Sequence, residues 1–395
     1  MLDLTKLKEG LTPSKKEEKE IERKVSIILK KIQKNLKEAT IILGGSYAKG
    51  TWLKDKHDID LFAQFKTEKN ISNTLERGLK KTFKNLERIH GSRDYFHIQE
   101  KNLEIEIVPV LKIKNPEEAK NITDISPLHV HFVRIHTNED LRNEIRLAKQ
   151  FFTAQNLYGA ETYIKGFSGY AVELLIIYYG SFFNLIKSMR TWETGDYLYF
   201  KKKEKLNPSK EGSLNFLDPV QEDRNAAAAL SHEKFMKAKQ AAEEFYKNPR
   251  KEMFKEKGVS KKEIFNYTII LEAIPVKGSK DVTRTKVLKV KERIEQELNQ
   301  EGFTVKKAGW HWEEEKAYLY YECKEKLEGL KTVEGPPIIK KEHMEEFKKK
   351  HKSIFIKKGK IYAREKRKYK EVKLFLQRVL KEAEIKKRIK KISLI

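Results

Sequence analysis

The sequence predicts an α+β protein built from several domains. Two runs, residues 58–63 and 103–110, alternate acidic and apolar residues as half-buried strands do. A longer stretch, residues 137–258, is mostly helical in its apolar spacing. From residue 263 the pattern changes to strand, helix, strand and strand, which is typical of a small α+β domain. A length of 395 residues fits two to four such domains.

A first helix is predicted to begin after Ser14. Thr12 and Pro13 precede this serine, and Glu17 follows it at the spacing of an N-terminal cap. Apolar residues then recur at helical spacing, so one face of the helix should pack on the sheet. They are Ile21, Val25, Ile28, Leu29, Ile32 and Leu36.

A glycine turn and a pair of aspartates follow this helix. The apolar strand Ala39–Leu43 leads into Gly44-Gly45-Ser46, where the glycines let the backbone approach a triphosphate closely. Asp58 and Asp60 then share one face of the next strand, because strand side chains alternate. Two like charges on one face need a cation, and Mg²⁺ takes carboxylate and phosphate oxygens.

A third carboxylate is expected on a neighbouring strand. The run Leu103–Val110 places Glu104 and Glu106 on one face. Two metal ions held by three carboxylates can activate a terminal hydroxyl and stabilise leaving pyrophosphate. A solvated strand face is the competing interpretation of any one of these motifs. Their order within about seventy residues favours catalysis instead.

These motifs resemble the nucleotidyltransferase superfamily of DNA polymerase beta and, within it, the archaeal, class I CCA-adding enzymes. The resemblance continues through an ordered series of segments, covering about residues 40–230. These are Leu141–Phe152, Tyr158–Glu161, Lys165–Tyr170, Glu173–Phe182, Asp218–Val220 and Asp223–Asn225.

The resemblance implies a tRNA nucleotidyltransferase that builds the 3′-terminal C-C-A from CTP and ATP without a nucleic-acid template. By position, Asp58, Asp60 and Glu106 would be the catalytic Mg²⁺ ligands. The nucleotide would contact Gly45, Ser46, Lys49, His129, Lys149, Tyr158 and Arg224, with Arg224 helping to recognise the base. Two positions depart from the family pattern: Glu106 stands where aspartate is usual, and Lys49 where arginine is common.

The residues themselves support some of these roles and leave others open. If Asn138 caps a helix through about residue 156, Arg142, Arg146 and Lys149 form a cationic stripe that can meet a triphosphate. A solvated helix face is the alternative. His129 has no cysteine nearby, which argues against zinc and leaves hydrogen bonding or packing. Tyr158 is of a type that is more often a core or interface aromatic than a ligand.

The charge of the chain indicates a polyanionic partner. Lys and Arg number 84 against 58 Asp and Glu, a net charge of +26, and residues 340–395 hold 22 basic against 7 acidic residues. Apolar and aromatic residues such as Phe355 and Tyr362 interleave with these charges, so the segment is expected to fold. A folded basic surface fits tRNA, with a membrane surface as the competing interpretation.

Four domains are predicted. They are a catalytic nucleotidyltransferase head with a mixed or antiparallel sheet (1–136), a helical neck for nucleotide recognition (137–258), a small α+β body (259–334) and a basic tail (335–395), which begins after the turn Gly335-Pro336-Pro337. In the family the body and tail grip the acceptor stem and the T-loop side of tRNA.

The remaining features bear on location and on alternatives. A single cysteine, Cys323, excludes an internal disulfide and fits a reducing cytoplasm. No export signal or membrane span is predicted, and the sequence allows a homodimer. An RNA-binding protein without catalysis is one alternative, against which three clustered carboxylates argue. An oligoadenylate synthetase or poly(A) polymerase is another, against which the neck and basic tail argue.

Overall fold

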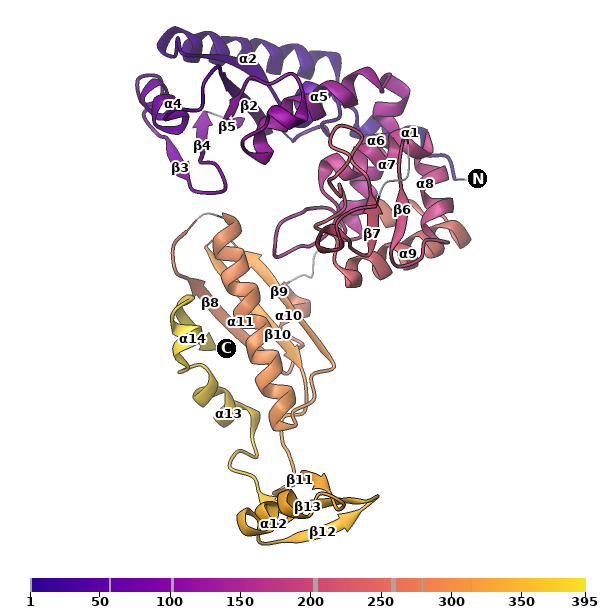
Figure 1. The fold of residues 1–395 in the computed structure, drawn as a ribbon, viewed down its shortest axis with the longest axis vertical. Helices are drawn as coiled ribbons and strands as arrows, with labels where there is room; N and C mark the ends of the chain where they lie inside the picture. Colours follow the sequence, from indigo (N-terminus) through magenta and orange to yellow (C-terminus); the bar gives the residue numbers. More distant parts are fainter. Residues whose placement is uncertain are drawn as a thin grey trace. The chain divides into compact units, whose positions relative to one another are not determined.

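The computed structural model describes residues 2–56, 58–100, 103–201, 205–256, 261–278, 280–313 and 315–395. They belong to two compact units, Met1–Lys257 and Gly258–Ile395, and Figure 1 labels most of their helices and strands. The predicted boundary between neck and body, at residues 258 and 259, lies outside the described residues.

The N-terminal unit contains a five-stranded mixed sheet, as predicted. In spatial order its strands are β1 (Ala39–Leu43), β2 (Asp58–Phe65), β5 (Leu103–Leu111), β4 (Tyr95–Glu100) and β3 (Glu87–Ile89). The central pair, β2 and β5, is parallel, and the other neighbours are antiparallel. β2 and β5 are the two predicted acidic strands, and they are parallel neighbours in the sheet. Their acidic residues therefore lie side by side.

Helix α2 (Lys15–Asn35) packs on this sheet together with α4 (Ile71–Lys80). The amide of Glu17 donates to Ser14 Oγ, so the predicted N-cap is confirmed. The predicted apolar face is also confirmed, because Ile21, Val25 and Ile32 are buried against the strands. Each such side chain contributes on the order of 1.5–3 kcal/mol.

A second core in the same unit is helical. Four rings, Phe151, Phe182, Phe245 and Phe254, lie with all their centroids 5.2–5.6 Å apart and form its centre. The elements of this unit outside the sheet are α1 (Thr5–Leu11), α3 (Gly45–Lys49), α5 (Ser126–Ile135), α6 (Glu139–Ala154), α7 (Gly169–Tyr179), α8 (Phe182–Met189), α9 (His232–Lys247), the short strands β6 (Asp196–Leu198) and β7 (Leu214–Phe216), and the 3-10 helices η1 (Pro116–Glu118), η2 (Ile122–Ile125), η3 (Pro208–Lys210) and η4 (Lys251–Phe254). Helix α1 packs on α6 and the helical core.

The C-terminal unit is built on a four-stranded antiparallel sheet. Its order is β14 (Ile389–Leu394), β8 (Ile269–Pro275), β10 (Lys316–Glu322) and β9 (Lys307–Glu313), and the helices are α10 (Lys261–Ile264), α11 (Lys280–Glu301), α13 (Val372–Val379) and α14 (Ala383–Lys386). The predicted order of strand, helix, strand and strand is present as β8, α11, β9 and β10. The first strand begins later than predicted, since residues 261–264 form α10.

Part of the segment assigned to the tail completes this sheet. Strand β14 pairs with β8, and Val372 and Phe375 of α13 are buried in the same core as α11. Local patterns do not show such a return, because the two paired strands are more than a hundred residues apart in the sequence.

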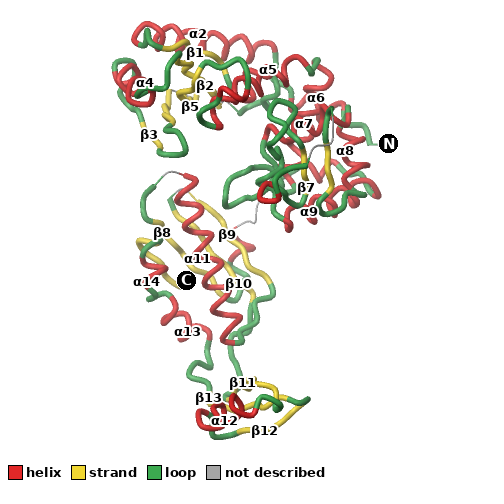
Figure 2. The backbone as a smooth tube through the Cα atoms, in the orientation of Figure 1, coloured by secondary structure: helices red, strands yellow, loops and turns green. Residues whose placement is uncertain are grey.

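A separate three-stranded sheet lies between β10 and α13 in the chain. Its order is β11 (Leu330–Pro337), β13 (Lys360–Lys366) and β12 (Ile354–Lys357), and α12 (Lys341–Lys350) packs on β11. Figure 2 shows these strands and this helix grouped together. The predicted turn at Gly335-Pro336-Pro337 is instead the irregular end of β11, where the register shifts after Glu334. Prolines are tolerated there because β11 is an edge strand.

Among the described residues no single helix has the length and apolarity to cross a membrane. Helices α7 and α8 meet those criteria only when taken together, and they are bent by 96° at the break between them.

Candidate active site

The turn after β1 brings the backbone directly against Asp60. Gly45 has φ +55°, a conformation that favours glycine. A Cβ atom on Gly45 would lie 1.5 Å from Asp60 Oδ2, and one on Gly44 would lie 2.7 Å from the ring of Phe62. Neither position accepts a side chain without a local rearrangement. The two glycines therefore allow the helix α3 to begin beside the Asp60 carboxylate.

Four carboxylates occupy matching positions on the parallel strands β2 and β5. Asp58 is paired with Glu104, and Asp60 with Glu106. Since residues two apart share a face, all four project from the same side of the sheet. Burial, and the charges of Glu106 and Asp58, raise the pKa of Asp60 to about 6. The face thus concentrates negative charge that a cation would relieve.

The donor set fits Mg²⁺. Asp58, Asp60 and Glu106 offer only hard oxygen ligands, and burial together with the neighbouring carboxylates raises the pKa of Asp60. In the described part of the chain, no three or more His, Cys, Asp or Glu side chains are arranged to hold an ion by themselves. In the usual magnesium shell one or two carboxylates are completed by substrate phosphates and water.

His97 is a member of this face that sequence reasoning missed. It lies opposite Glu106 on β4, and its Nε2 atom is 3.6 Å from Glu106 Oε2. The interaction with Glu106 raises the pKa of His97. The alternating strand Tyr95–Glu100 placed a histidine next to the acidic strand, but only the pairing register shows which carboxylate it meets.

Lys49 and Lys149 meet on a buried glutamate that sequence reasoning also missed. Lys49 Nζ lies 2.6 Å from Glu173 Oε2, and Lys149 Nζ lies 2.8 Å from Glu173 Oε1. The hydroxyl of Thr51 donates to the same carboxylate at 2.6 Å. Glu173 is 1% exposed, and the lysines are 8% and 3% exposed. Lys149 is therefore paired inside the unit rather than presented on a solvated helix face, and Lys49 shares the same partner.

The two lysines keep Glu173 ionised. Burial alone would raise the pKa of Glu173, but Lys149 and Lys49 lower it to about 2. The same lysines oppose the rise in the pKa of Asp60. One signal in the sequence pointed to Glu173, since it is the sole charged residue in the apolar helix Gly169–Tyr179.

Arg146 joins the helical part of the unit to the loop that follows the turn. It is 1% exposed and donates to the carbonyls of Gly50 at 2.7 Å and Trp52 at 3.1 Å. Asn138 caps this helix through its side chain, as predicted. Arg146, a member of the predicted cationic stripe, thus donates hydrogen bonds to backbone carbonyls beside the site.

A second cluster gathers around the buried carboxylate of Asp218. Arg224 Nη1 donates to Asp218 Oδ2 at 2.6 Å, and the Tyr170 hydroxyl donates to Oδ1 at 3.0 Å. His129 Nε2 lies 3.0 Å from Oδ2, and the His129 ring stacks on Tyr170 with centroids 4.2 Å apart. Burial opposes ionisation, but His129 and Arg224 lower the pKa of Asp218 to about 2. Asp218 thus holds Arg224 by a hydrogen bond and lies within ion-pair distance of His129.

The two clusters meet at Tyr170. Lys49 Nζ lies 5.6 Å from the centre of the Tyr170 ring, and Arg224 Cζ lies 5.9 Å from it. Cations at this distance from an aromatic face are attracted to it. Lys49, Lys149, His129 and Arg224 therefore belong to one connected network.

Tyr158 and Ser46 are the other two predicted nucleotide contacts. Tyr158 is half-buried, and its hydroxyl lies 2.7 Å from where a Cβ on Gly169 would be, so it packs closely on the start of α7. Burial and the charge of Glu173 raise the pKa of Tyr158. Ser46 is half-buried in α3, where its carbonyl accepts from the amide of Thr51 at 3.0 Å.

Three family models match successive parts of the chain. They are the nucleotidyltransferase domain (residues 25–129), the second domain of tRNA nucleotidyltransferase (143–255) and the C-terminal domain of the CCA-adding enzyme (275–392). Together they extend over most of both units.

Curated relatives match over nearly the whole length. Proteins named CCA-adding enzyme from Methanocaldococcus jannaschii and Nanoarchaeum equitans are 32% and 33% identical, over 91% and 90% of this chain and 86% and 91% of their own lengths. Solved structures share the fold at 12% identity. A cytoplasmic RNA terminal U-transferase has a TM-score of 0.51, over 65% of this chain and 97% of its own. The Cid1 RNA terminal uridylyl transferase has a TM-score of 0.53, over 64% and 97%.

Proposed function

The chain belongs to the archaeal family of CCA-adding enzymes, and from this membership we propose how its residues carry out the reaction. The enzyme adds C-C-A to the 3′ end of tRNA, taking the nucleotides from CTP and ATP without a template and releasing pyrophosphate. The match of all three family models in order along one chain is the observation that carries this function.

Asp58, Asp60 and Glu106 would hold Mg²⁺ and perform the catalytic role. Metal ions held by these carboxylates would supply activation of the tRNA 3′ hydroxyl and charge stabilisation of the leaving pyrophosphate. The register of β2 and β5 supports this assignment, because it sets Asp60 directly beside Glu106. Glu106 has one methylene more than aspartate, and His97 Nε2 lies 3.6 Å from its carboxylate.

The turn and the paired lysines would receive the triphosphate. Gly45 brings the backbone close to Asp60, and Ser46 follows it in the turn, where both would contact phosphate. Lys49 and Lys149 are held by Glu173, so their charges stay fixed near the carboxylates without a loss of side-chain freedom on binding. Tyr158 lies beside the same network and would contact the nucleotide there.

Arg224 would read the base, with His129 beside it. Only Nη1 of Arg224 donates to Asp218 in this structure, and the side chain is 30% exposed. Its other N–H groups can donate to the ring nitrogens of cytosine and adenine, which are acceptors, whereas uracil and guanine carry N–H donors at the corresponding positions. Arg224→Lys should increase incorporation of U and G. Unchanged discrimination would remove Arg224 from this role.

The basic C-terminal residues would bind tRNA along the acceptor stem and T-loop side. Their charge supports this proposal, because phosphate contacts need exposed Lys and Arg. In the same proposal residues 1–136 act as the head and 137–258 as the neck, the four-stranded sheet that includes β14 acts as the body, and the three-stranded sheet of β11, β13 and β12 acts as the tail. A tRNA substrate and a single cysteine favour the cytoplasm. A homodimer is tested by the mass of the purified protein in solution.

Product analysis tests the function directly. The protein and Mg²⁺ are incubated with a tRNA transcript that lacks its 3′ end, and with CTP, ATP or both. We expect two C residues with CTP alone and C-C-A with both. A long A tail would indicate a poly(A) polymerase, and tight tRNA binding without addition would indicate an RNA-binding protein.

A pair of variants tests the site. Asp60→Ala should abolish addition of both CMP and AMP while tRNA binding persists. Glu104→Gln is the matched control, since Glu104 lies on the same face but is not assigned to the metal. Loss of only one nucleotide in Asp60→Ala would contradict a shared site.

A further inference from the structure

The three-stranded sheet of the C-terminal unit has two chemically different faces. One face lies under α12. Ile361 and Ala363 of β13 are 1% and 0% exposed on it, and a Cβ on Gly335 would lie 2.7 Å from Ile361 and 2.8 Å from Phe347 of α12. Over β13 this face is covered by a small hydrophobic core, whereas Ile354 and Ile356 of the edge strand β12 remain exposed on it.

The opposite face presents a pair of stacked aromatic rings. Phe355 of β12 lies directly opposite Tyr362 of β13. Their ring centroids are 5.5 Å apart and their planes differ by 19°. Both side chains are only half-buried, and the adjacent Arg364 on β13 is exposed, with its guanidinium 5.3 Å from the Phe355 ring centre. Such rings are held in place without being covered.

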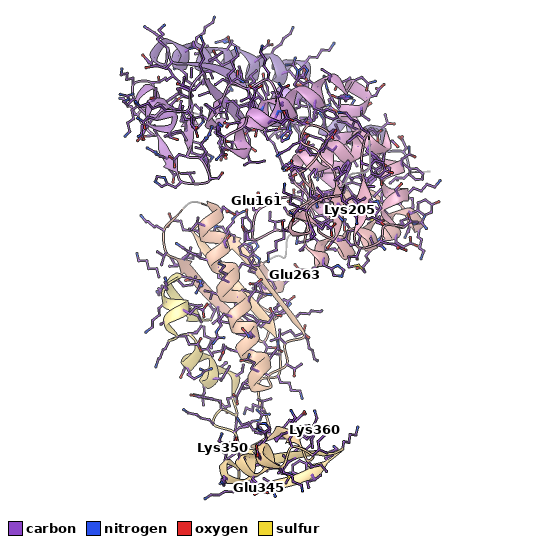
Figure 3. All side chains as sticks on the ribbon, viewed as in Figure 1. Glu161, Lys205, Glu263, Glu345, Lys350 and Lys360 are labelled. Carbon is purple, nitrogen blue, oxygen red and sulfur yellow. The ribbon has the colours of Figure 1, made fainter. Side chains whose placement is uncertain are left out.

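Cations surround this pair. Lys357 is the register partner of Lys360, and both share the face of Phe355 and Tyr362 because side chains alternate along each strand. Lys366 lies farther along β13 on the same face and is exposed. Lys360, which is labelled in Figure 3, hydrogen-bonds Glu334 at 2.5 Å. The other cations here outnumber this carboxylate, so the face suits a negatively charged partner.

We propose that this aromatic face, centred on Phe355 and Tyr362, stacks an unpaired base of the tRNA, while Arg364 and Lys357 hold the flanking phosphates. The inference rests on the proposed tRNA substrate. Structured RNAs expose unpaired bases in their loops, and proteins capture them on aromatic rings set in a basic sheet face. An acidic protein partner would use the cations but has no need of a parallel pair of rings.

The test separates stacking from charge. Phe355→Leu with Tyr362→Leu keeps apolar bulk and removes both rings. It should weaken binding of full-length tRNA about 5- to 150-fold, the range expected for one lost stacked base. The slope of log affinity against log salt should stay at the wild-type value, since no phosphate contact is removed. Tyr362→Phe, which keeps the ring, should bind as the wild type does.

Matched variants address folding. Ile356→Ala removes a 63% exposed apolar side chain from the other face of the same strand and should leave tRNA affinity unchanged. Circular dichroism should show the same secondary structure in every variant. A weaker affinity in Ile356→Ala equal to that of the double variant would overturn the proposal, because it would assign the effect to the stability of the sheet.

Turnover distinguishes this inference from the function on which it rests. At saturating tRNA the double variant should add C-C-A with the wild-type kcat and a raised KM for tRNA. Wild-type tRNA affinity in the double variant would overturn the stacking proposal while leaving C-C-A addition intact. Absence of addition by the wild-type protein would instead overturn the proposed function.

Discussion

Two groups of lysines in this protein have the same side-chain chemistry but lie in opposite environments, one buried and the other exposed. Lys49 and Lys149 are buried around Glu173 in the N-terminal unit. Lys349 and Lys350 are exposed at the end of α12 in the C-terminal unit, where Lys350 is labelled in Figure 3. A net charge of +26 counts them equally. The energetic effect of a buried charge therefore depends on its ionic partner, whereas that of an exposed charge depends on the counterions that it can exchange.

The energetic consequences differ accordingly. A buried ion pair that loses one member leaves an uncompensated charge in a medium of low polarity, which costs about 3–5 kcal/mol. An exposed lysine is solvated in every state of the free protein, so its removal changes folding by about 0.5 kcal/mol or less. Its effect is seen instead when a polyanion displaces the salt around it.

The largest expected effect is that of Glu173→Gln. The amide keeps the shape of the side chain but leaves Lys49 and Lys149 without a counter-charge. We expect a loss of about 3–5 kcal/mol in the stability of the N-terminal unit, measured by denaturant unfolding. Glu161→Gln is the matched control, because Glu161 is exposed. Equal stability of the two variants would contradict the contrast between buried and exposed charge.

Arg146→Lys should have the next largest effect. Lysine keeps the charge but cannot donate to the carbonyls of Gly50 and Trp52 with the same fork of N–H groups. Buried acceptors left without a donor cost about 1–3 kcal/mol. Arg142→Lys, on the same helix, is the control, since the Arg142 side chain is 28% exposed. Unfolding midpoints of both variants check the prediction, which fails if Arg142→Lys is the more damaging.

The binding of Mg²⁺ should weaken in acid. The pKa of Asp60, raised to about 6, means that a proton occupies the carboxylate at about pH 5 and competes with the cation. We expect an affinity about tenfold lower at about pH 5 than at about pH 7, from calorimetric titration. Asp60→Asn should bind more weakly and lose most of this dependence. A flat profile in the wild type would contradict the assignment of Asp60.

The raised pKa of Asp60 also determines the direction in which stability changes with pH. The folded pKa of Asp60 lies above the ordinary value of 3.8, so the metal-free protein binds more protons when folded. Its stability therefore falls through this group as the pH rises from about 4 to 6. Added Mg²⁺ should offset that loss at about pH 7, and thermal unfolding with and without the ion measures it.

The smallest effect on folding is expected from Lys349→Gln with Lys350→Gln. Stability should change by about 0.5 kcal/mol or less. If both residues contact phosphates, the slope of log tRNA affinity against log salt should become shallower by about 2. A change in stability without a change in the salt slope would contradict the proposed difference between the buried and the exposed lysines.

Local patterns predicted much of the fold. The caps at Ser14 and Asn138 depend on residues three positions away, and the alternation in β2 and β5 depends on neighbours two positions away. The acidic strands were predictable for the same reason. The alternation is compatible with their parallel pairing but does not specify it. That pairing, which places Asp60 beside Glu106, is a tertiary contact.

The parts that were missed depend on distant contacts. Glu173 is 124 residues from Lys49, and the return of β14 to β8 joins segments more than a hundred residues apart. Asp218 was visible as part of a motif, but its position between His129, Tyr170 and Arg224 was not. Side chains from separate elements meet only after the chain has folded, so no single window of sequence contains the signal.

The connection to the three-stranded sheet has a consequence for how the protein can vary. The chain leaves the larger sheet and returns to it along two adjacent segments. The amide of Leu327 donates to the Lys370 carbonyl at 2.8 Å, and the amide of Val372 donates to the Glu325 carbonyl at 2.9 Å. An insertion whose ends lie this close can be exchanged for a short turn without moving its host. The segment between them is thus a replaceable cassette, whose length and chemistry can change while the surrounding core is kept.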